Sequence, residues 1–356
     1  MGCQPARIAV RVSAILCLLW FFFAVLPVKA NPLSLEAGSA ILMDMGSRRL
    51  LYEQDSGRKI PPASLTKVMS MYVALDAVKD GKLSLRTPVR ISKAAARVGG
   101  SAMRLKAGQR VPLDNLLQGM AVVSANDASA AVAEHVAGSQ AAFVALMNRK
   151  AKQIGMKNTV FKTPHGLPAK GQVTTAADML LLACSYLKAH PSARGYHSAP
   201  AMLHNGIVMQ NTNKLLGHDS VSGLKTGFTR ESGYNIILTS THNGREMVGV
   251  LMRAPSAEVR SREAQRLLDY GARLQTSLGK KSARPSGAHN PKNIKTSPKH
   301  PGEIADATAA QRSAKKAKRQ TASSADDKRA QESPPLRRTL PSTAALPAPV
   351  QGGRPR

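Results

Sequence analysis

The order of strand-like and helix-like segments is the feature of this sequence that most constrains its fold. Short apolar runs bounded by turn residues occur near the start and again in the last third of the periodic region, at 40–43, 49–52, 224–226, 234–241 and 246–253. Between these two groups the apolar residues recur at helical spacing, at 113–123, 128–136, 141–154 and 176–187. Because strands need partners, we expect one sheet assembled from both ends of the chain, in an α+β domain with a helical insert.

Turn residues place the boundaries of several of these elements. Gly46-Ser47 and Asn243-Gly244 each separate two apolar runs, so each predicts a hairpin. Pro61-Pro62 ends the first extended region, and an apolar helix is expected from Ser64 to Gly81. A last helix is expected at 256–274.

The composition changes sharply near Leu278, where apolar periodicity ends and Ala, Pro, Ser, Lys and Arg take over. From Lys280 the chain carries seventeen Lys or Arg and five Asp or Glu, a net charge of +12. We therefore expect a folded domain at 31–277 and a disordered basic tail at 278–356. This tail is either a solubilising extension or an arm that contacts an anionic wall polymer or membrane surface.

The whole chain of 356 residues has a formal net charge of +30, which favours an anionic neighbour without identifying it. Among the possible anionic partners (nucleic acid, a membrane surface or a wall polymer), nucleic acid is the least favoured, because the basic tail contains no Phe, Tyr or Trp on which bases could stack.

The first thirty residues have the pattern of a secretory signal peptide. Arg7 and Arg11 precede an apolar run at 12–25. The segment ends at Ala30, a small residue of the kind found at signal-peptide cleavage sites. An uncleaved anchor helix is the alternative, since the run is near the lower length limit for crossing a bilayer. The sequence thus predicts export to the periplasm or the outer face of the cytoplasmic membrane. Cys184 is then the lone cysteine of the mature chain, and we expect a buried structural thiol.

Ser64 and Lys67 form the first candidate catalytic pair. A serine hydroxyl becomes a nucleophile when a nearby base accepts its proton, and residues three apart share one face of a helix. The lysine would need burial or a second cation nearby to be neutral. The spacing alone is weak evidence, because it recurs at Ser277/Lys280 and Ser313/Lys316.

Two later motifs strengthen this hypothesis. Ser124-Ala125-Asn126 follows an apolar run at a junction between a helix and a loop, where a hydroxyl and an amide could face a cleft. Lys225-Thr226-Gly227 lies on an expected strand, and its glycine would let another backbone or a substrate approach closely. Each motif alone also fits an ordinary helix cap or strand.

In this order the three motifs resemble those of the active-site-serine penicillin-binding proteins and β-lactamases, and the chain is similar to the low-molecular-mass D-alanyl-D-alanine carboxypeptidases of serine peptidase family S11. The resemblance covers about Leu35 to Leu274. It includes the segments Pro62 to Lys67, Ser124 to Ala128, His165 to Leu167, Gly223 to Gly227 and Gly233 to Asn235, and Arg260 followed by Leu267-Leu268. It implies the penicillin-binding-protein/β-lactamase-like fold, with an antiparallel sheet flanked by helices.

The resemblance also implies a reaction. Ser64 would attack the peptide carbonyl between two D-alanines at the end of a peptidoglycan stem, and water would hydrolyse the acyl-enzyme. Lys67 would be the base in acylation, Ser124 would relay a proton to the leaving amine, and Asn126 would hold the substrate amide. No cofactor or metal is implied.

The same resemblance assigns binding roles near the second strand group. Lys225 and Thr226 would contact the terminal carboxylate of the substrate, with Arg260 as a second contact. Gly227 precedes Phe228, whose backbone N–H would form the oxyanion hole together with that of Ser64. Phe228 replaces a His often found there, which leaves the backbone role intact.

One absence sharpens the prediction. The segment 163–175 contains no Asp or Glu, whereas class A β-lactamases use a Glu from a comparable loop to activate the deacylating water. β-Lactam antibiotics are therefore expected to be covalent inhibitors that leave slowly. A D,D-endopeptidase that cuts cross-links, or a non-catalytic wall-binding or penicillin-sensing module, are the alternatives.

Overall fold

The structure is a computed structural model that describes residues 33–218 and 220–282. The predicted signal peptide and almost all of the predicted tail lie outside these residues. The last helix, α9 (Ala257–Ser282), continues past position 277, where the sequence analysis ended the folded domain.

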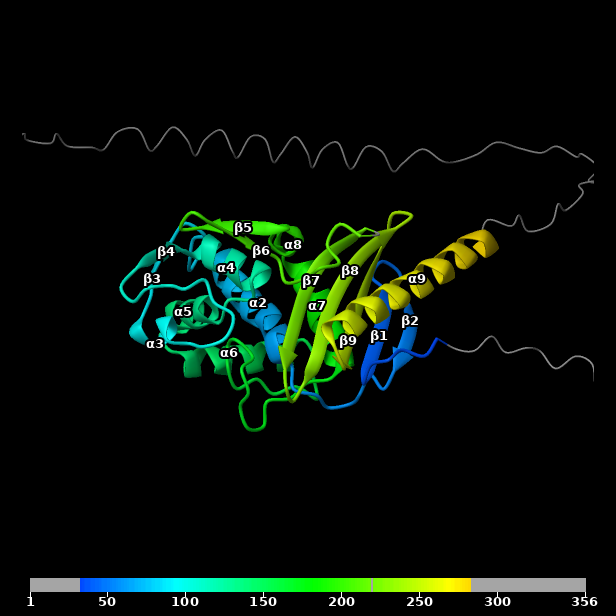
Figure 1. Ribbon diagram of the computed structural model, residues 1–356, viewed down its shortest axis with the longest axis horizontal. Helices are drawn as coiled ribbons and strands as arrows, with labels where there is room; N and C mark the ends of the chain where they lie inside the picture. Colours follow the sequence, from blue (N-terminus) through cyan, green and yellow to red (C-terminus); the bar gives the residue numbers. More distant parts are fainter. Residues whose placement is uncertain (1–32, 219, 283–356) are drawn as a thin grey trace, which may run out of the picture. The chain divides into compact units, whose positions relative to one another are not determined.

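A five-stranded sheet forms the centre of the domain (Figure 1). Its order is β2-β1-β9-β8-β7, and all neighbours are antiparallel. The strands are β1 (Ser39–Asp44), β2 (Leu50–Gln54), β7 (Val221–Thr229), β8 (Gly233–His242) and β9 (Arg245–Ala254). In the β1–β9 pair Leu42 lies opposite Gly249, so the first strand pairs with the last. The predicted sheet from both ends of the chain is confirmed.

The hairpin predicted at Asn243-Gly244 is also present. Asn243 and Gly244 have φ angles of 48° and 72°, the left-handed conformation that a two-residue hairpin turn requires. This turn joins β8 to β9 and sets their register, in which His242 lies opposite Arg245.

The central segment is helical, as its periodicity predicts. Its main helices are α4 (Leu113–Val122), α5 (Asn126–Ala137), α6 (Gln140–Gln153) and α7 (Ala176–Ala189). The helix expected from Ser64 begins later: Ala63–Leu65 form a 3₁₀ turn, η1, and α2 spans Thr66–Lys79. No single helix among the described residues is long and apolar enough to cross a membrane, although the bent pair α5 and α6 passes that test by length and composition.

Several short elements escaped the sequence analysis because they are too short to show a period. They are β3 (Pro88–Arg90), α3 (Lys93–Ala96), β4 (Arg110–Pro112), η2 (Pro191–Ala193), α8 (Arg194–Ser198), β5 (Ala201–His204) and β6 (Ile207–Gln210). β3 pairs with β4 and β5 with β6 as separate two-stranded sheets.

The two faces of the central sheet carry two hydrophobic cores. Side chains alternate along β1, so Ile41 packs in the larger core with the helical insert and Leu42 in the smaller core with α9. Figure 1 shows α9 across the near face of the sheet, and α7 contacts β1 and β9 within the larger core. The larger core includes Val68 and Met69 of α2, so the helix that follows Ser64 is held in the interior.

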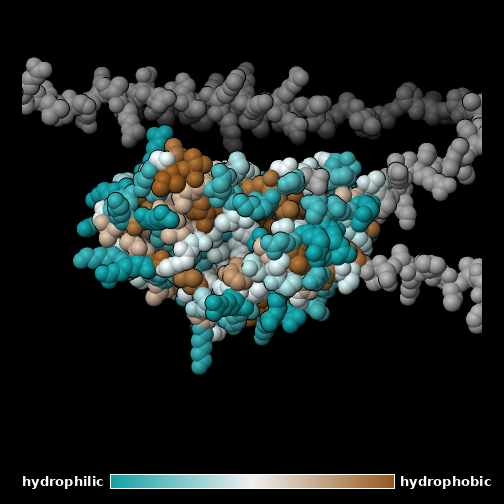
Figure 2. Space-filling model, viewed as in Figure 1, coloured by the Kyte–Doolittle hydropathy of each residue, from teal (hydrophilic) through white to brown (hydrophobic). Residues whose placement is uncertain are grey.

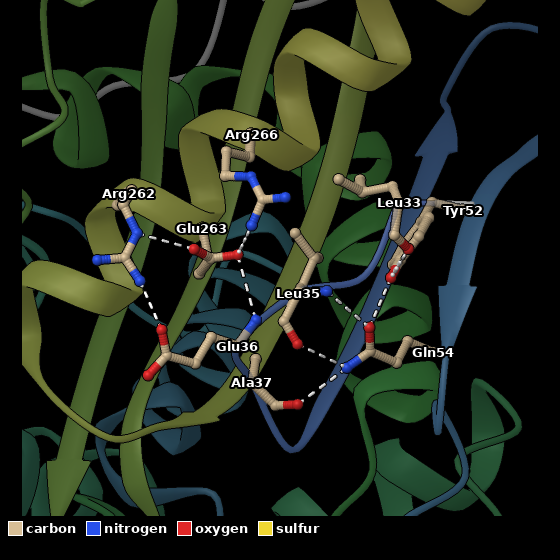
Figure 3. A network of polar contacts seen from close by, with 9 residues as sticks. All are labelled: Leu33, Leu35, Glu36, Ala37, Tyr52, Gln54, Arg262, Glu263 and Arg266. Carbon is tan, nitrogen blue, oxygen red and sulfur yellow. Dashed lines mark hydrogen bonds and ion pairs between the residues drawn. The ribbon is translucent and has the colours of Figure 1, made fainter. Parts of the chain in front are cut away.

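A polar network fastens the first described residues to this scaffold (Figure 3). The Gln54 amide accepts from Leu35 N–H at 3.1 Å and donates to the carbonyl oxygens of Leu35 and Ala37 at 3.1 and 2.9 Å. The Glu263 carboxylate accepts from Glu36 N–H at 3.2 Å. Arg262 and Arg266 bind the same carboxylate at 2.9 and 2.6 Å, so its burial in α9 is compensated.

Candidate active site

Ser64 lies in the η1 turn, between the helical insert and the free edge of the sheet. Ala63, the residue before it, has a φ of 47°, a left-handed conformation that is costly for alanine. A Cβ atom at Gly166 would lie 1.8 Å from the carbonyl oxygen of Ala63, so the missing side chain of Gly166 makes room for this turn. The backbone around Ser64 is therefore held in a strained position by its neighbours.

Lys67 projects back toward Ser64, as the spacing predicts. Its Nζ lies 3.0 Å from Ser64 Oγ, 2.7 Å from Asn126 Oδ1 and 2.7 Å from the carbonyl oxygen of His165. The Lys67 side chain is fully buried. The structure thus brings Ser64, Lys67 and Asn126 together.

The amide of Asn126 has a defined orientation. Its Nδ2 donates to the carbonyl oxygen of Gly99 at 2.7 Å, and a carbonyl oxygen can only accept. Asn126 Oδ1 therefore faces Lys67 as an acceptor. Gly100 allows this approach, because a Cβ there would lie 2.7 Å from Asn126 Nδ2.

These partners suit a neutral amine at Lys67. A neutral amine has two N–H donors and one lone pair, and Asn126 and His165 each offer only an acceptor oxygen to it. The lone pair is then available to the hydroxyl of Ser64. Burial lowers the pKa of Lys67 well below its usual 10.5, and the charge of Lys225 lowers it further, while Asp127 opposes the shift.

Asp127 anchors the loop that faces the site. Its carboxylate accepts from the backbone N–H groups of Met103 and Leu105 at 3.0 Å each and from Ala128 N–H at 2.8 Å. Asn126 N–H donates to the carbonyl oxygen of Ser101 at 2.7 Å. The residues from Ser101 to Leu105 are thereby fixed to the start of α5.

Ser124 lies in the turn between α4 and α5, two residues before Asn126. It is buried, and its φ of 61° is left-handed, which is uncommon for a serine. Strained backbone of this kind is concentrated at functional sites, and here it occurs at Ala63, which precedes Ser64, and at Ser124.

The third motif lies on the edge strand β7, which packs against η1. A Cβ at Gly227 would lie 3.1 Å from the backbone nitrogen of Ser64, so this glycine makes room for the serine turn itself. Thr226 Oγ1 donates to Thr212 Oγ1 at 2.8 Å, and Thr212 N–H donates to the carbonyl oxygen of Val122 at 3.0 Å. Thr212 therefore ties β7 to the end of α4.

Lys225 is buried beside two other ionisable groups. Burial and the charge of Arg260 lower its pKa to about 7. His197 lies behind it, where Nδ1 is 2.9 Å from the carbonyl oxygen of Leu224. Burial and Lys225 lower the pKa of His197 to about 3, so this imidazole is neutral.

The aromatic residues Phe228 and Tyr234 stack at 4.2 Å between ring centres at the end of β7. Phe228 is 49% exposed, so its side chain forms part of the surface. The Arg260 guanidinium lies 6.0 Å from the Tyr234 ring centre, and its buried Nε has no hydrogen-bond partner among the described residues. Arg260 therefore has an unused buried donor near Lys225.

The loop 163–175 supplies backbone rather than carboxylates. The carbonyl oxygen of His165 accepts from Lys67. The loop is held in place by the Gln172 side chain, which accepts from the N–H of Lys162 and Thr163 at 3.1 Å each and donates to the Leu167 carbonyl at 2.9 Å. The sequence analysis assigned no role to Gly99, Asp127, His165, Gly166 or Thr212. The glycine pair at 99–100 and the glycine of the segment His165 to Leu167 are the signals that could have indicated close backbone contacts.

Cys184 is not part of this site. It is a half-buried free thiol on α7, which corrects the expectation of full burial. Burial raises its pKa to about 11, which makes it unreactive at neutral pH.

Comparison with known proteins places the chain in a family of peptidases. Residues 27–256 match the model of the S11 peptidases, described as D-alanyl-D-alanine carboxypeptidase. The chain is 38% identical over 249 residues to the D-alanyl-D-alanine carboxypeptidase DacC of Escherichia coli, a match covering 68% of this chain and 62% of that protein. The chain therefore spans less than two thirds of this relative's length.

Two further relatives bear on the activity. The chain is 32% identical over 230 residues to a D-alanyl-D-alanine endopeptidase of Pseudomonas aeruginosa, covering 61% of this chain and 72% of that protein. The structure superimposes with a TM-score of 0.63 on Penicillin-Binding Protein D2 from Listeria monocytogenes in the ampicillin-bound form, at 30% identity, covering 68% of this chain and 99% of that one.

The fold is that of a penicillin-binding protein of the D,D-peptidase class. The chain belongs to the S11 family of D-alanyl-D-alanine carboxypeptidases.

Proposed function

We propose that this protein is a serine-type D-alanyl-D-alanine carboxypeptidase that removes the terminal D-alanine from peptidoglycan pentapeptide stems. The observation that carries the proposal is the buried Lys67 amine, held 3.0 Å from Ser64 Oγ by two acceptor oxygens. A base in this position can take the hydroxyl proton as the oxygen attacks.

The acylation step follows from this geometry. Ser64 Oγ attacks the carbonyl carbon of the penultimate D-alanine while its proton passes to Lys67. The C–N bond then breaks, and the leaving amine of D-alanine takes a proton relayed through Ser124. Asn126, which is hydrogen-bonded to Lys67, holds the substrate amide. An ester on Ser64 remains after the amine has left.

The substrate is held from the β7 side. Lys225 and Thr226 contact its terminal carboxylate, and Arg260 offers its unused Nε as a second contact. The backbone N–H groups of Ser64 and Phe228 stabilise the tetrahedral oxyanion, worth about 3 kcal/mol of barrier each. Gly227 supports this arrangement because its missing side chain lets β7 lie against the serine turn.

Deacylation distinguishes this site from that of a penicillin-destroying enzyme. Segment 163–175 holds Lys67 through a backbone carbonyl and has no carboxylate to activate water against a β-lactam ester. We therefore infer that β-lactams acylate Ser64 and are released slowly.

The test measures D-alanine release from a synthetic pentapeptide mimic and labelling by fluorescent penicillin. Wild-type protein should do both, and Ser64→Ala should do neither while keeping its melting temperature. Ser185→Ala, on the outer part of α7, is the matched control and should behave as wild type. If Ser64→Ala is labelled as well as wild type, the assignment of the nucleophile is wrong.

The endopeptidase alternative has support from the Pseudomonas relative. Isolated peptidoglycan separates the two activities, because a carboxypeptidase releases D-alanine from monomeric pentapeptides and an endopeptidase converts cross-linked dimers into monomers. We expect D-alanine release to be the faster reaction. Penicillin labelling without either product would instead favour a non-catalytic penicillin-sensing or wall-binding module.

We also propose that the protein acts in the periplasm or on the outer face of the cytoplasmic membrane, because the proposed substrate lies outside the cytoplasm and the sequence predicts a signal peptide. Mass spectrometry of penicillin-labelled protein from cells should find the adduct on Ser64 and a mature N-terminus at Asn31. An N-terminus at Met1 or Gly2 would indicate an anchor instead.

A further inference from the structure

The β5–β6 hairpin carries an exposed apolar surface. Leu203, Ile207 and Val208 are 65, 57 and 62% exposed, the highest values among the large exposed hydrophobic residues in the described part of the chain. Figure 2 shows the corresponding hydrophobic area over the end of β5 and β6, at the top of the view. Three aliphatic side chains on one short hairpin are an exposed patch rather than scattered residues.

The stretch from Lys82 to Leu113 contains no Asp or Glu and carries a second, basic surface. Seven of its cations are exposed and form no ion pair within the described residues: Arg86, Arg90, Lys93, Arg97, Arg104, Lys106 and Arg110. In the β3–β4 pair, Arg90 lies directly opposite Arg110. Like charges at such positions destabilise a strand pair, which is consistent with an anionic partner outside the chain.

The two surfaces meet. A hollow of about 540 Å³ lies between them, lined on one side by Arg104 and Lys106 and on the other by Ile207, Val208 and Met209. No Asp or Glu lines it. Aliphatic tips beside unpaired Lys and Arg side chains match the interface of an anionic bilayer, where apolar groups enter the acyl region and cations stay with the headgroups.

We propose that the surface formed by the β5–β6 hairpin and the loop around Arg104 and Lys106 docks on an anionic lipid bilayer. A lipid surface fits better than a glycan polymer, because residues 201–210 offer exposed aliphatic side chains and no Phe, Tyr or Trp for a sugar to stack on, and the ring of His204 is buried. The docking residues are not among those assigned to the proposed reaction, although the loop that holds Arg104 also faces the active site, and the docking is separate from any contact made by the two ends of the chain.

Tryptophan fluorescence tests the docking in the full chain. The sequence has one tryptophan, Trp20, so wild-type protein gives the background. Val208→Trp places a reporter on the hairpin, and Leu50→Trp places a matched reporter on β2, where Leu50 is 45% exposed. The probe is vesicles of phosphatidylglycerol and brominated phosphatidylcholine, since bromine quenches only tryptophan that reaches the acyl region.

We expect the added emission of Val208→Trp to shift to the blue and to be quenched at least twofold more than that of Leu50→Trp. Adding Arg104→Gln and Lys106→Gln should weaken vesicle binding of the reporter about fivefold or more at low salt. The matched charge control, Lys152→Gln with Lys157→Gln on and after α6, should have a smaller effect on quenching. Thermal melts establish that each variant is folded.

Equal quenching of Val208→Trp and Leu50→Trp would overturn the proposal. So would quenching that is unchanged in vesicles without phosphatidylglycerol, because the cations would then have no role. If soluble peptidoglycan fragments shift the Val208→Trp emission in the absence of lipid, the surface binds a wall polymer and the lipid assignment is wrong. Penicillin labelling reports the proposed reaction separately from each of these results.

Discussion

Lys225 makes the site sensitive to pH because its ammonium is buried next to Arg260. With a pKa of about 7, it loses its proton as the pH rises through neutrality, and its attraction for a substrate carboxylate is lost with it. Lys67 must be neutral to act as a base, and its pKa is lowered well below 10.5. The rate should therefore fall at low pH as Lys67 is protonated and at high pH as Lys225 is deprotonated.

Arg260→Gln tests this assignment. The positive charge of Arg260 lowers the pKa of Lys225, so its removal should raise that pKa and move the alkaline limb of kcat/KM for D-alanine release to higher pH. KM should also rise, because a carboxylate contact is lost. Arg262→Gln, a more exposed arginine on the same helix, is the control and should leave the alkaline limb in place. An unmoved limb in Arg260→Gln would show that another group titrates there.

The same burial costs stability. A lysine with a folded pKa of about 7 and an unfolded value near 10.4 favours the unfolded state at pH 7 by on the order of 4 kcal/mol. This penalty is full below pH 7 and disappears as the pH rises toward 10. Lys225→Met should therefore raise the melting temperature at pH 7 while weakening substrate binding.

Calorimetry at pH 7 and pH 9.5 measures this effect. The gain in melting temperature should shrink at the higher pH, because wild-type Lys225 is neutral in the folded state and the free energy of removing its proton falls as the pH approaches the unfolded pKa near 10.4. A gain that is equal at both values would mean that packing, not charge, is responsible.

At the scale of elements, the loop 163–175 controls the position of the serine turn. Gly166 has a φ of 87°, and a Cβ there would lie 1.8 Å from the Ala63 carbonyl oxygen. Gly166→Ala should therefore displace η1 and lower the rate of penicillin acylation at least tenfold, since an error of about 1 Å at a reacting atom can cost a factor of about 100.

Gly171→Ala is the matched control for this loop. Gly171 has a similar φ of 80°, but the nearest atom to its Cβ would be Lys162 Cε at 3.7 Å. Both variants carry the same backbone strain, worth roughly 1 kcal/mol, and differ only in the clash. Stopped-flow acylation should separate them, and equal rates would mean that the loop does not position Ser64.

These elements also show what the sequence could and could not predict. The spacing of apolar residues in the strands and long helices predicted the sheet and the helical insert, and the turn residues Asn243-Gly244 predicted the hairpin. The i to i+3 spacing predicted that Lys67 faces Ser64. The 3₁₀ turn at Ser64 was not predictable, because it depends on Gly166, which is a hundred residues away in the sequence.

Backbone contributions to the site were missed for the same reason. The carbonyl oxygens of Gly99 and His165 hold Asn126 and Lys67, and a carbonyl group leaves no residue-specific signal. The short pairs β3–β4 and β5–β6 were missed because three or four residues are too few to show a period of two.

At the scale of the whole molecule, the site depends on a sheet whose first and last strands are adjacent. β1 pairs with β9 some two hundred residues later, and α9 then covers the smaller core over both. The position of β7 against Ser64 therefore requires that the two ends of the domain fold together. Global stability should be sensitive to the contact between α9 and β1, even though this contact lies on the other face of the sheet from the larger core.

Gly271 on α9 makes that contact. A Cβ there would lie 2.5 Å from Leu42 Cδ2 and 2.7 Å from Met247 Sδ, within the smaller core. A glycine-to-alanine change inside a helix ordinarily stabilises by about 1 kcal/mol, whereas overpacking a core costs roughly 1–3 kcal/mol. Gly271→Ala should therefore lower the melting temperature, and Gly195→Ala in α8, where a Cβ would meet nothing within 4 Å, should leave it unchanged or raise it.

Calorimetry of both variants decides the point, with penicillin labelling of the folded protein as the second measurement. Gly271→Ala should unfold in a single transition at lower temperature and still acylate at the wild-type rate below that temperature, since Leu65 and Val68, which flank Ser64 and Lys67, belong to the larger core. A melting temperature at or above that of wild type would show that α9 can move away from β1 without cost. The closure of the domain by its last helix would then be looser than the packing at Leu42 indicates.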